Sequence, residues 1–522
     1  MPSLVRVLPG VYQDSIKLMR IGSAASGRTG VRRAMAVLGT PMNLEQLAAA
    51  GFRVEEAKAA GPNDLILAVE AGSDATAAEA FREMEAALTA RPAAGTAFPG
   101  QLTAFSSLDA ALEADPGINL TLISVPGPWA RREAERALRK GLHCLVFSDN
   151  VPVEDEVALK RLGRERGLLV MGPDCGTCHI GGVGLGFCNV MRPGPIGIVG
   201  AAGTGIQEAM AAIDRAGGGI RCALGTGGRD VTDAIGALAM TDAIRFLAAD
   251  PATNILLVLG KPPEPRALRA VLDALGEAEK PTAVHFVGAE AEAVRRGYRG
   301  KSPLHVAGTL AEAGRLAVSL MRGSAPAVAP EPSRELLAEV SAWAREEKGD
   351  RRKFLRGLYT GGTLCAEAQA ILRKTLGTIR SNAPLAKADK MADPEVSWEH
   401  TIIDLGDDHF TRGRPHPMIE PSLREKRMLR EAADPETAVL LFDVVLGQGA
   451  HPDPGGEAAK VVARAKHEGS EALFLCSVTG TAGDPQGLEV QRRKLREAGA
   501  VVAETHAESC RLAEAAFREL RR

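Results

Sequence analysis

The sequence predicts an α/β fold made of several doubly wound parallel-sheet domains, Rossmann-like and flavodoxin-like, plus a small N-terminal α+β unit. Apolar strands alternate with helices along most of the 522 residues, which is typical of helices layered on parallel sheets. A chain of this length is too long for one hydrophobic core. Between residues 195 and 238, two strands each run into glycines and then into an expected helix.

The first part of the chain predicts a compact α+β unit. Residues 14–20 have a helical pattern, residues 33–38 and 65–69 are apolar strands, and residues 44–50 form an expected helix that Asn43 would cap. This order is compatible with a ferredoxin-like fold.

The middle of the chain has the pattern of half a dinucleotide-binding fold. Strands are expected at 120–125, 143–147 and 168–171, and helices at 130–140 and 153–166. Two larger α/β domains follow, separated by a Pro/Ala-rich linker. The expected divisions are the N-terminal unit 1–70, a helical connector 71–100, a CoA-binding-like Rossmann half-fold 101–190, a ligase-like domain 191–322, a linker and helix 323–350, and a second ligase-like, flavodoxin-type domain 351–522.

Glycine-rich turns after strands predict an anion site. In the first, residues 201–205 precede an expected helix at 206–213, and Thr204 with Gln207 has the spacing of a capping box. The second precedes an expected helix at 231–238. Free N–H groups at helix N-termini bind phosphates, and a guanidinium adds a fixed charge. The predicted ligands of a phosphate or acyl-phosphate group are Gly203, Thr204, Gly205, Gly227, Gly228, Arg229, Gly447, Gln448 and Gly449.

The last domain carries candidate acid/base groups. Asp408, His416 and His451 are the predicted catalytic residues, since carboxyl and imidazole groups can move a proton at a transferred amide. Arg412 and Arg414 are predicted to hold a substrate carboxylate. The same Asp and His side chains could bind a divalent metal, although no metal site is predicted, and a solvated, salt-bridged loop is the alternative.

Composition excludes several classes of function. A net charge of -2 and only 4% aromatic residues argue against a nucleic-acid partner. No apolar run approaches the ~20 residues of a membrane span, and the N-terminus has no signal-peptide pattern, so we expect a cytoplasmic protein. The eight cysteines are expected to be small buried side chains. Residues 175–179 match the C-x-x-C-H haem pattern, with a redox or metal dithiol as a further alternative.

Four motifs that follow one another in the chain carry a family resemblance. They are Ser124–Trp129 (SVPGPW), Ser148–Pro152 (SDNVP), Gly172–Cys175 (GPDC) and Gly197–Gly205 (GIVGAAGTG). The set resembles the α-subunit of succinyl-CoA synthetase and related ADP-forming acyl-CoA synthetases. Residues 350–520 resemble the carboxy-terminal ligase domain of the β-subunit. The whole chain is similar to FdrA-type proteins.

Two departures from the synthetases bear on function. The synthetases carry a phosphorylated histidine in a Gly-His-Ala-Gly-Ala segment after the strand that here ends at Phe286, and this chain continues Val287-Gly-Ala-Glu. Lys261 stands where that family has an acidic partner for the phosphohistidine. We find no nucleotide-binding ATP-grasp domain in the sequence. His285 and His305 lie nearby and are expected to be packed structural residues.

The resemblance to FdrA-type proteins implies a specific activity. It implies the large subunit of an oxamate carbamoyltransferase that acts with two other subunit types in anaerobic allantoin breakdown. The reaction interconverts oxalurate plus phosphate with oxamate plus carbamoyl phosphate, with no phosphohistidine and no required cofactor. The alternatives are an ADP-forming acyl-CoA synthetase or CoA-binding relative, and a non-catalytic scaffold subunit. Coenzyme A and a divalent metal stay open as ligands.

Overall fold

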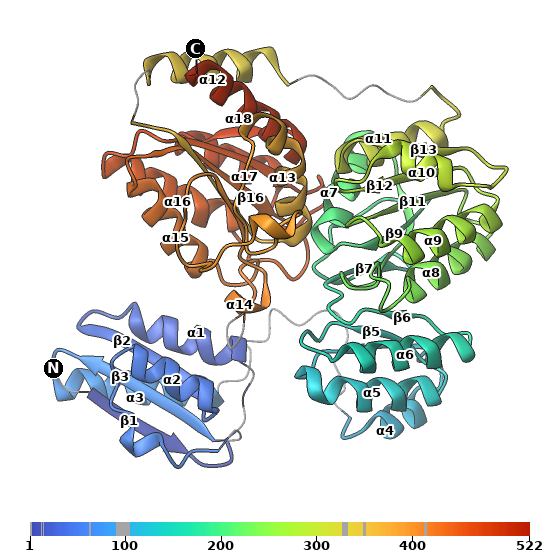
Figure 1. Ribbon diagram of the computed structural model, residues 1–522. Helices are drawn as coiled ribbons and strands as arrows, with labels where there is room; N and C mark the ends of the chain where they lie inside the picture. The colour runs from blue at the N-terminus through green and yellow to red at the C-terminus, as the bar shows by residue number, and fades with distance from the viewer. Residues whose placement is uncertain are drawn as a thin grey trace. The chain divides into compact units, whose positions relative to one another are not determined.

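The computed structural model of the chain, drawn in Figure 1, divides into two compact units. One unit comprises residues 1–107 with 412–415, and the other comprises residues 108–411 with 416–522. The residues that the structure describes are 3–11, 13, 15–61, 64–89, 105–325, 332–347, 351–411 and 415–521. Among them, no helix is long and apolar enough to cross a membrane.

The N-terminal unit is an antiparallel sheet of strand order β1-β3-β2 with helices on both faces. Strand β3 is buried along its whole length. Apolar residues of α1 and α3 pack on one face of the sheet, and Leu47 of α2 packs on the other. The elements are β1 (Ser3–Leu8), α1 (Ser15–Ser26), β2 (Val31–Leu38), α2 (Pro41–Ala49), the 3₁₀ turn η1 (Glu55–Ala57), β3 (Leu65–Ala71) and α3 (Asp74–Thr89).

The cap of α2 differs from the expectation. Thr40 is the N-cap, and its side chain accepts a hydrogen bond from the Asn43 N–H. Pro41 occupies the first helical turn, where its fixed φ is favourable and its missing N–H costs nothing. The prediction that Asn43 caps this helix is therefore wrong; its side-chain amide instead donates to the Leu38 carbonyl.

The second unit begins with a small parallel sheet of order β4-β5-β6. Helices α5 and α6 pack against it through small apolar residues such as Ala130, Ala134 and Leu159. The strands and both helices were expected from the sequence within a few residues. The elements are α4 (Leu108–Ala114), β4 (Leu120–Ile123), α5 (Gly127–Arg139), β5 (His143–Val146), α6 (Val153–Glu165) and β6 (Val170–Met171).

A seven-stranded sheet of order β13-β12-β11-β9-β10-β7-β8 follows. Its first five strands run parallel, whereas the hairpin β7–β8, which was not expected, adds to one edge in antiparallel fashion. The elements are β7 (Thr177–Ile180), β8 (Val183–Gly186), β9 (Pro193–Ala201), α7 (Gly203–Arg215), β10 (Ile220–Gly225), α8 (Leu238–Ala249), β11 (Ile255–Gly260), α9 (Pro265–Ala278), β12 (Thr282–Phe286), α10 (Ala291–Gly297), β13 (Leu304–Val306) and α11 (Leu310–Met321).

The last sheet has five parallel strands in the order β15-β14-β16-β17-β18. The elements are α12 (Arg334–Glu346), β14 (Phe354–Tyr359), α13 (Gly362–Leu376), the 3₁₀ turn η2 (Lys387–Asp389), β15 (Thr401–Asp404), α14 (Asp408–Thr411), α15 (Ser422–Ala433), β16 (Thr437–Val445), α16 (Pro454–His467), β17 (Leu473–Thr479), α17 (Leu488–Glu497), β18 (Val501–Ala503) and α18 (His506–Leu520).

The two large sheets share one hydrophobic core. Helices α7 and α11 of the first domain and α13 and α18 of the second all contribute to it, through residues such as Ile206, Leu310, Leu364 and Leu512. The outer faces of the sheets are covered by α8 and α9 in one domain and by α15 and α16 in the other, as can be followed in Figure 1. This packing places the first turns of α7 and α13 against each other.

Candidate functional site

Two helix N-termini meet where the large domains join. Helix α7 begins after Ala202 and α13 begins after Gly361, and neither helix has a side-chain cap. A Cβ atom on Gly361 would lie only 2.3 Å from Thr204 Cγ2, so the close approach requires glycine at that position. Two neighbouring first turns without side-chain caps, each the positive end of a helix dipole, are suited to an anion.

Thr204 has an unpartnered polar atom at this place. Its side chain is 7% exposed, and its buried Oγ1 has no hydrogen-bond partner. Because Ala202 is the N-cap, Thr204 lies inside the first turn of α7, and the predicted capping box with Gln207 is wrong. The Gln207 amide instead donates to Asn189 and to the Leu446 carbonyl. The Thr204 hydroxyl is thus available to a ligand.

Lys261 and Asp404 lie beside the first turn of α13. A Cβ atom on Gly362 would be 2.7 Å from Asp404 Oδ2 and 3.9 Å from Lys261 Nζ. Lys261 follows strand β11 and is exposed, while Asp404 ends strand β15 and is 8% exposed. The ends of strands in both large domains thus bring a cation and a carboxyl group to the two helix N-termini, as expected for ligand sites of open α/β sheets.

The pKa of the Asp404 carboxyl lies close to neutral pH. Burial raises its pKa to about 7, while the charge of Lys261 and a hydrogen bond from the Gly406 N–H lower it. The Asn382 side chain pairs with the Asp404 backbone on both its N–H and its carbonyl, at 2.9 Å each, which fixes the position of the residue. Asp404 was not among the predicted site residues, although its position at the carboxyl end of an apolar strand was a usable signal.

The second glycine turn does not lead directly into a helix. Helix α8 begins at Leu238, seven residues later than expected, because the Asp230 carboxylate accepts the N–H groups of Ala239 and Met240. Gly236 and Ala237 have left-handed backbone angles just before it. The prediction of a helix at 231–238 is therefore wrong, and the first turn of α8 is already capped.

Arg229 lies on this loop and has protein partners. It donates to the Val151 carbonyl and pairs with the buried Glu156 at 2.9 Å, yet 40% of its side chain remains exposed. Its charge also acts on the exposed Asp174, on which the charge of Asp408 acts in the opposite sense. Arg229 and Asp408, both predicted as site residues, are thus brought to the same carboxyl group.

The loop Gly447–Gly449 has a structural role in the described fold. Gln448 forms an antiparallel bridge with Cys188, exchanging both backbone hydrogen bonds. The Gly447 N–H donates to the Gln486 side chain. A Cβ atom on Gly449 would lie 2.8 Å from the Gly186 carbonyl oxygen. The backbone N–H groups of Gly447 and Gln448 already donate to protein acceptors. The anion-binding role of this loop remains a prediction.

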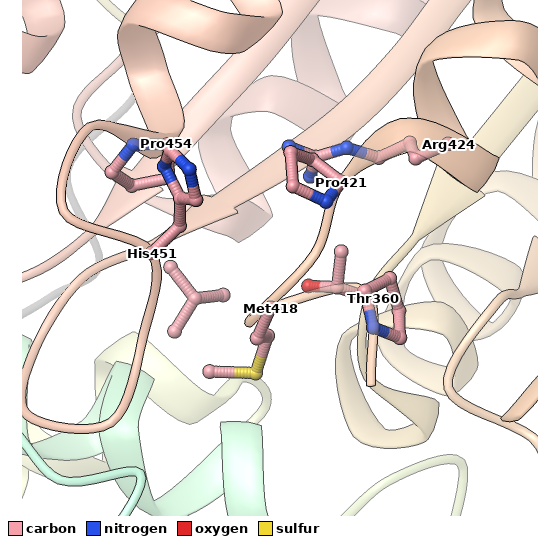
Figure 2. Close-up of a pocket in the computed structure, with 8 residues that line it drawn as sticks. Thr360, Met418, Pro421, Arg424, His451 and Pro454 are labelled. Carbon is pink, nitrogen blue, oxygen red and sulfur yellow. The ribbon is translucent and has the colours of Figure 1, made fainter. Parts of the chain in front are cut away.

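The two predicted catalytic histidines occupy different places. His416 Nδ1 accepts the Met418 N–H, and burial lowers the pKa of the ring to about 4, so the ring is neutral at pH 7 with its proton on Nε2. That Nε2 lies near Gly406, next to Asp404. His451 lines a small, mostly apolar pocket, and Figure 2 shows it across from Arg424. Its Nδ1 accepts the Asp453 N–H.

Arg412 and Arg414 lie outside the described residues, so their predicted carboxylate role stays a prediction. Asp443 is a fully buried carboxylate that accepts hydrogen bonds from the Thr360 N–H and hydroxyl, so it is a hydrogen-bonded core residue. His285, expected to be packed, is 4% exposed with Nδ1 3.0 Å from the Ala307 carbonyl oxygen.

The cysteines are buried. All eight are free, and Cys175 Sγ lies 3.6 Å from Cys178 Sγ inside the core. His179 is 3% exposed, so the C-x-x-C-H segment presents no open surface for a haem. The interpretation as structural cysteines is confirmed. Within the described ranges, no cluster of three or more His, Cys, Asp or Glu side chains is arranged to hold a metal ion.

The chain matches the profiles of three families. The family described as CoA-ligase matches residues 358–516, the CoA binding domain matches 191–288, and the AllF heavy metal-associated domain matches 1–101. The CoA-binding match thus covers β9 to β12, and the expectation of a CoA-binding-like half-fold at 101–190 stays a prediction.

The chain is also similar to proteins of several organisms. YahF of Escherichia coli is 38% identical over 95% of both chains, and the α-2 subunit of succinate–CoA ligase from Trichomonas vaginalis is 31% identical over 34% of this chain and 59% of that protein. The dinucleotide-forming acetyl-CoA synthetase 1 of Ca. Korarchaeum cryptofilum aligns over 77% of this chain and 82% of that one, with 16% identity and a TM-score of 0.31.

The CoA-ligase and CoA-binding profiles, together with the succinate–CoA ligase relative, place the protein in the succinyl-CoA synthetase and ADP-forming acyl-CoA synthetase superfamily. Within that superfamily, the chain belongs to the FdrA-type family together with YahF.

The family names imply a heavy metal and coenzyme A, and the residues present match neither group well. Soft heavy metals need thiolate or imidazole ligands, and residues 1–107 contain no cysteine or histidine, so the N-terminal unit does not fit such a metal. For coenzyme A, the matching profile covers β9 to β12 at residues 191–288, and the contacts described there do not identify side chains that would hold an adenine or a pantetheine. No catalytic step is therefore derived through either group.

Proposed function

We propose that the chain is the large subunit of a carbamoyltransferase that interconverts oxalurate plus phosphate with oxamate plus carbamoyl phosphate. The observation that carries the proposal is the pair of uncapped helix N-termini with Lys261 beside them. An anion site of this kind suits a phosphate that reacts directly. The lysine stands where the resemblance to the synthetases places an acidic partner of a phosphohistidine.

The chemistry needs positioning and charge stabilisation more than a protein nucleophile. A phosphate oxygen forms a bond to the carbamoyl carbon of oxalurate, and the bond from that carbon to the oxamate nitrogen breaks. The proton of the phosphate ends on that nitrogen. The helix N-termini, the Thr204 hydroxyl and Lys261 would hold the phosphate oxygens during transfer.

The remaining predicted residues take supporting roles in this proposal. Arg229 keeps an exposed guanidinium for a second anionic group, and Arg412 and Arg414 are proposed to hold the oxamate carboxylate. The AllF-type profile at residues 1–101 supports a place in allantoin breakdown. Two further subunit types are proposed to act with this chain.

The test is an assay for carbamoyl phosphate formed from oxalurate and phosphate, with the chain alone and with proteins that co-purify with it. Lys261→Met should weaken phosphate binding at least tenfold in calorimetry and reduce product formation. Lys301→Met, which removes an exposed lysine of the same domain, is the matched control. Absence of product in every combination would refute the proposal.

A CoA-dependent acyl transfer is the second candidate, favoured by the CoA-ligase and CoA-binding profiles. Titration of coenzyme A into the same preparations distinguishes the two. Heat of binding with coenzyme A, together with no carbamoyl phosphate, would support the second candidate.

A further inference from the structure

The Asp404 carboxyl lies at the proposed phosphate site but has no role in holding an anion. It is placed at the first turn of α13, on the side where Lys261 also lies. A permanently ionised carboxylate there would repel a phosphate dianion. A carboxyl that can take up a proton would not, so its place beside two helix N-termini indicates a group that exchanges a proton with the ligand.

We propose that Asp404 carries the proton of the transfer reaction, from the attacking phosphate to the departing amide nitrogen. The inference rests on the proposed function. As the phosphate oxygen bonds to the carbamoyl carbon, the carboxylate accepts the phosphate's proton. When the carbon–nitrogen bond breaks, its electron pair stays on nitrogen and the carboxyl returns the proton there, so atoms and charges balance.

The geometry of the carboxyl fits a shuttle. Oδ1 is held by the Gly406 N–H at 2.9 Å, while Oδ2 faces the first turn of α13. The backbone of Asp404 is clamped by Asn382 on both sides. A carboxyl group fixed through one oxygen and directed to the ligand with the other can accept and release a proton without moving.

The charges around Asp404 keep both of its protonation states accessible. Lys261 on the neighbouring domain favours the carboxylate, whereas Asp407 on the same loop and Asp443 on β16 favour the acid. The neutral ring of His416 adds no charge, and the buried thiol of Cys365 on α13 stays protonated because burial raises its pKa. This balance supports the geometric argument.

The experiment compares kcat with phosphate affinity in the full-length protein and whatever proteins co-purify with it. Asp404→Asn keeps the size of the side chain and the hydrogen bond from Gly406. We expect kcat for carbamoyl phosphate formation to fall about 10²-fold or more. Calorimetry should show phosphate binding unchanged or tighter, since a negative charge is removed. Asp393→Asn, at an exposed position of the same domain, is the control and should retain wild-type kcat.

A second variant guards against a folding defect. Asp404→Ala should be inactive and should regain activity saturably with formate, which replaces the missing carboxyl. Wild-type protein without any product would refute the proposed function, and this inference with it. Active wild-type protein with an equally active Asp404→Asn variant, or with no formate rescue of an otherwise folded and phosphate-binding Asp404→Ala variant, would refute the role of Asp404 alone.

Discussion

Glu208 on α7 and Glu367 on α13 each accept a hydrogen bond from the backbone N–H of the first residue in the last helix of the other large domain. Glu208 Oε1 accepts from His506 N at 3.1 Å, and Glu367 Oε1 accepts from Leu310 N at 2.7 Å. Both glutamates stand five residues after the first glycine of a Gly-Thr helix start, at Gly203 and Gly362. The two large domains are therefore joined by the same contact made twice, in opposite directions.

The Glu367–His506 pair should make the stability of this interface depend on pH. His506 Nδ1 lies 2.6 Å from Glu367 Oε2, and both side chains are buried. Burial opposes both shifts, but the neighbouring Cys510 and Glu367 raise the pKa of His506 well above 6.5, and His506 lowers the pKa of Glu367 from 4.5. The stability due to His506 is fully present below pH 6.5 and is lost as the pH rises through its raised pKa. That due to Glu367 is present above pH 4.5 and is lost in acid.

Glu367→Gln tests this dependence. Removing one partner of a buried pair costs about 3 kcal/mol, so the Tm should fall by several degrees near neutral pH. The alkaline decline of Tm expected for the wild type should become smaller in this variant, because Glu367 no longer favours the protonated His506. Glu497→Gln, at an exposed position, should leave both unchanged. An identical alkaline decline in Glu367→Gln and wild type would show that the pair does not titrate as described.

Lys160 should be essential for the loop that carries Arg229. Its fully buried ammonium donates to Glu156, to Asp230 and to the Thr226 carbonyl. Lys160→Met would leave the buried Asp230 without its cation and Glu156 with Arg229 alone, at a cost of about 3–5 kcal/mol. We expect a lower Tm and faster limited proteolysis between residues 226 and 237.

Lys140→Met is the matched control for that experiment, because Lys140 pairs with Asp109 at the surface. Adding Asp230→Asn to Lys160→Met should recover part of the lost stability, since one unpaired charge disappears. Equal Tm values for Lys160→Met and Lys140→Met would contradict the buried network.

The native cysteines should be inert to thiol reagents. All eight are buried, and burial raises the pKa of Cys144, Cys188 and Cys476 to about 12. Because the thiolate is the reactive form, we expect no reaction with Ellman's reagent at pH 8 in the folded protein. Eight thiols should react after unfolding in guanidinium chloride. One rapidly reacting thiol in the native protein would identify an open cysteine and contradict this prediction.

The sequence predicts the order of the strands and helices well and the ends of these elements poorly. Strand–helix alternation is local, so β4 to β6 were expected within a few residues. The start of α8 was missed because its cap, Asp230, acts from eight residues before the helix. A capping side chain brought back by a loop leaves no mark in hydrophobic periodicity.

Only one of the two helix N-termini at the site was predicted from the sequence. The glycine turn before α7 was recognised, but the matching turn at Gly361–Gly362 before α13 was not, although it follows strand β14 in the same manner. Lys261 and Asp404 come together only because β11 and β15 belong to domains that pack against each other. Such long-range proximity cannot be read from spacing along the chain.

The predicted anion-binding role of Arg229 can be tested separately from its structural contacts with Val151 and Glu156. Arg229→Ala should weaken phosphate or carbamoyl phosphate binding about tenfold, the loss of one charge-assisted contact. The buried Glu156 keeps Lys160 as a partner, and the Arg229 side chain is 40% exposed, so the Tm should fall by no more than a few degrees. Calorimetry with phosphate and a thermal melt measure the two effects. Arg229→Lys keeps the charge but loses the planar fork, and should bind with intermediate affinity. A variant that melts much earlier but binds phosphate normally would assign Arg229 to the Glu156 contact alone.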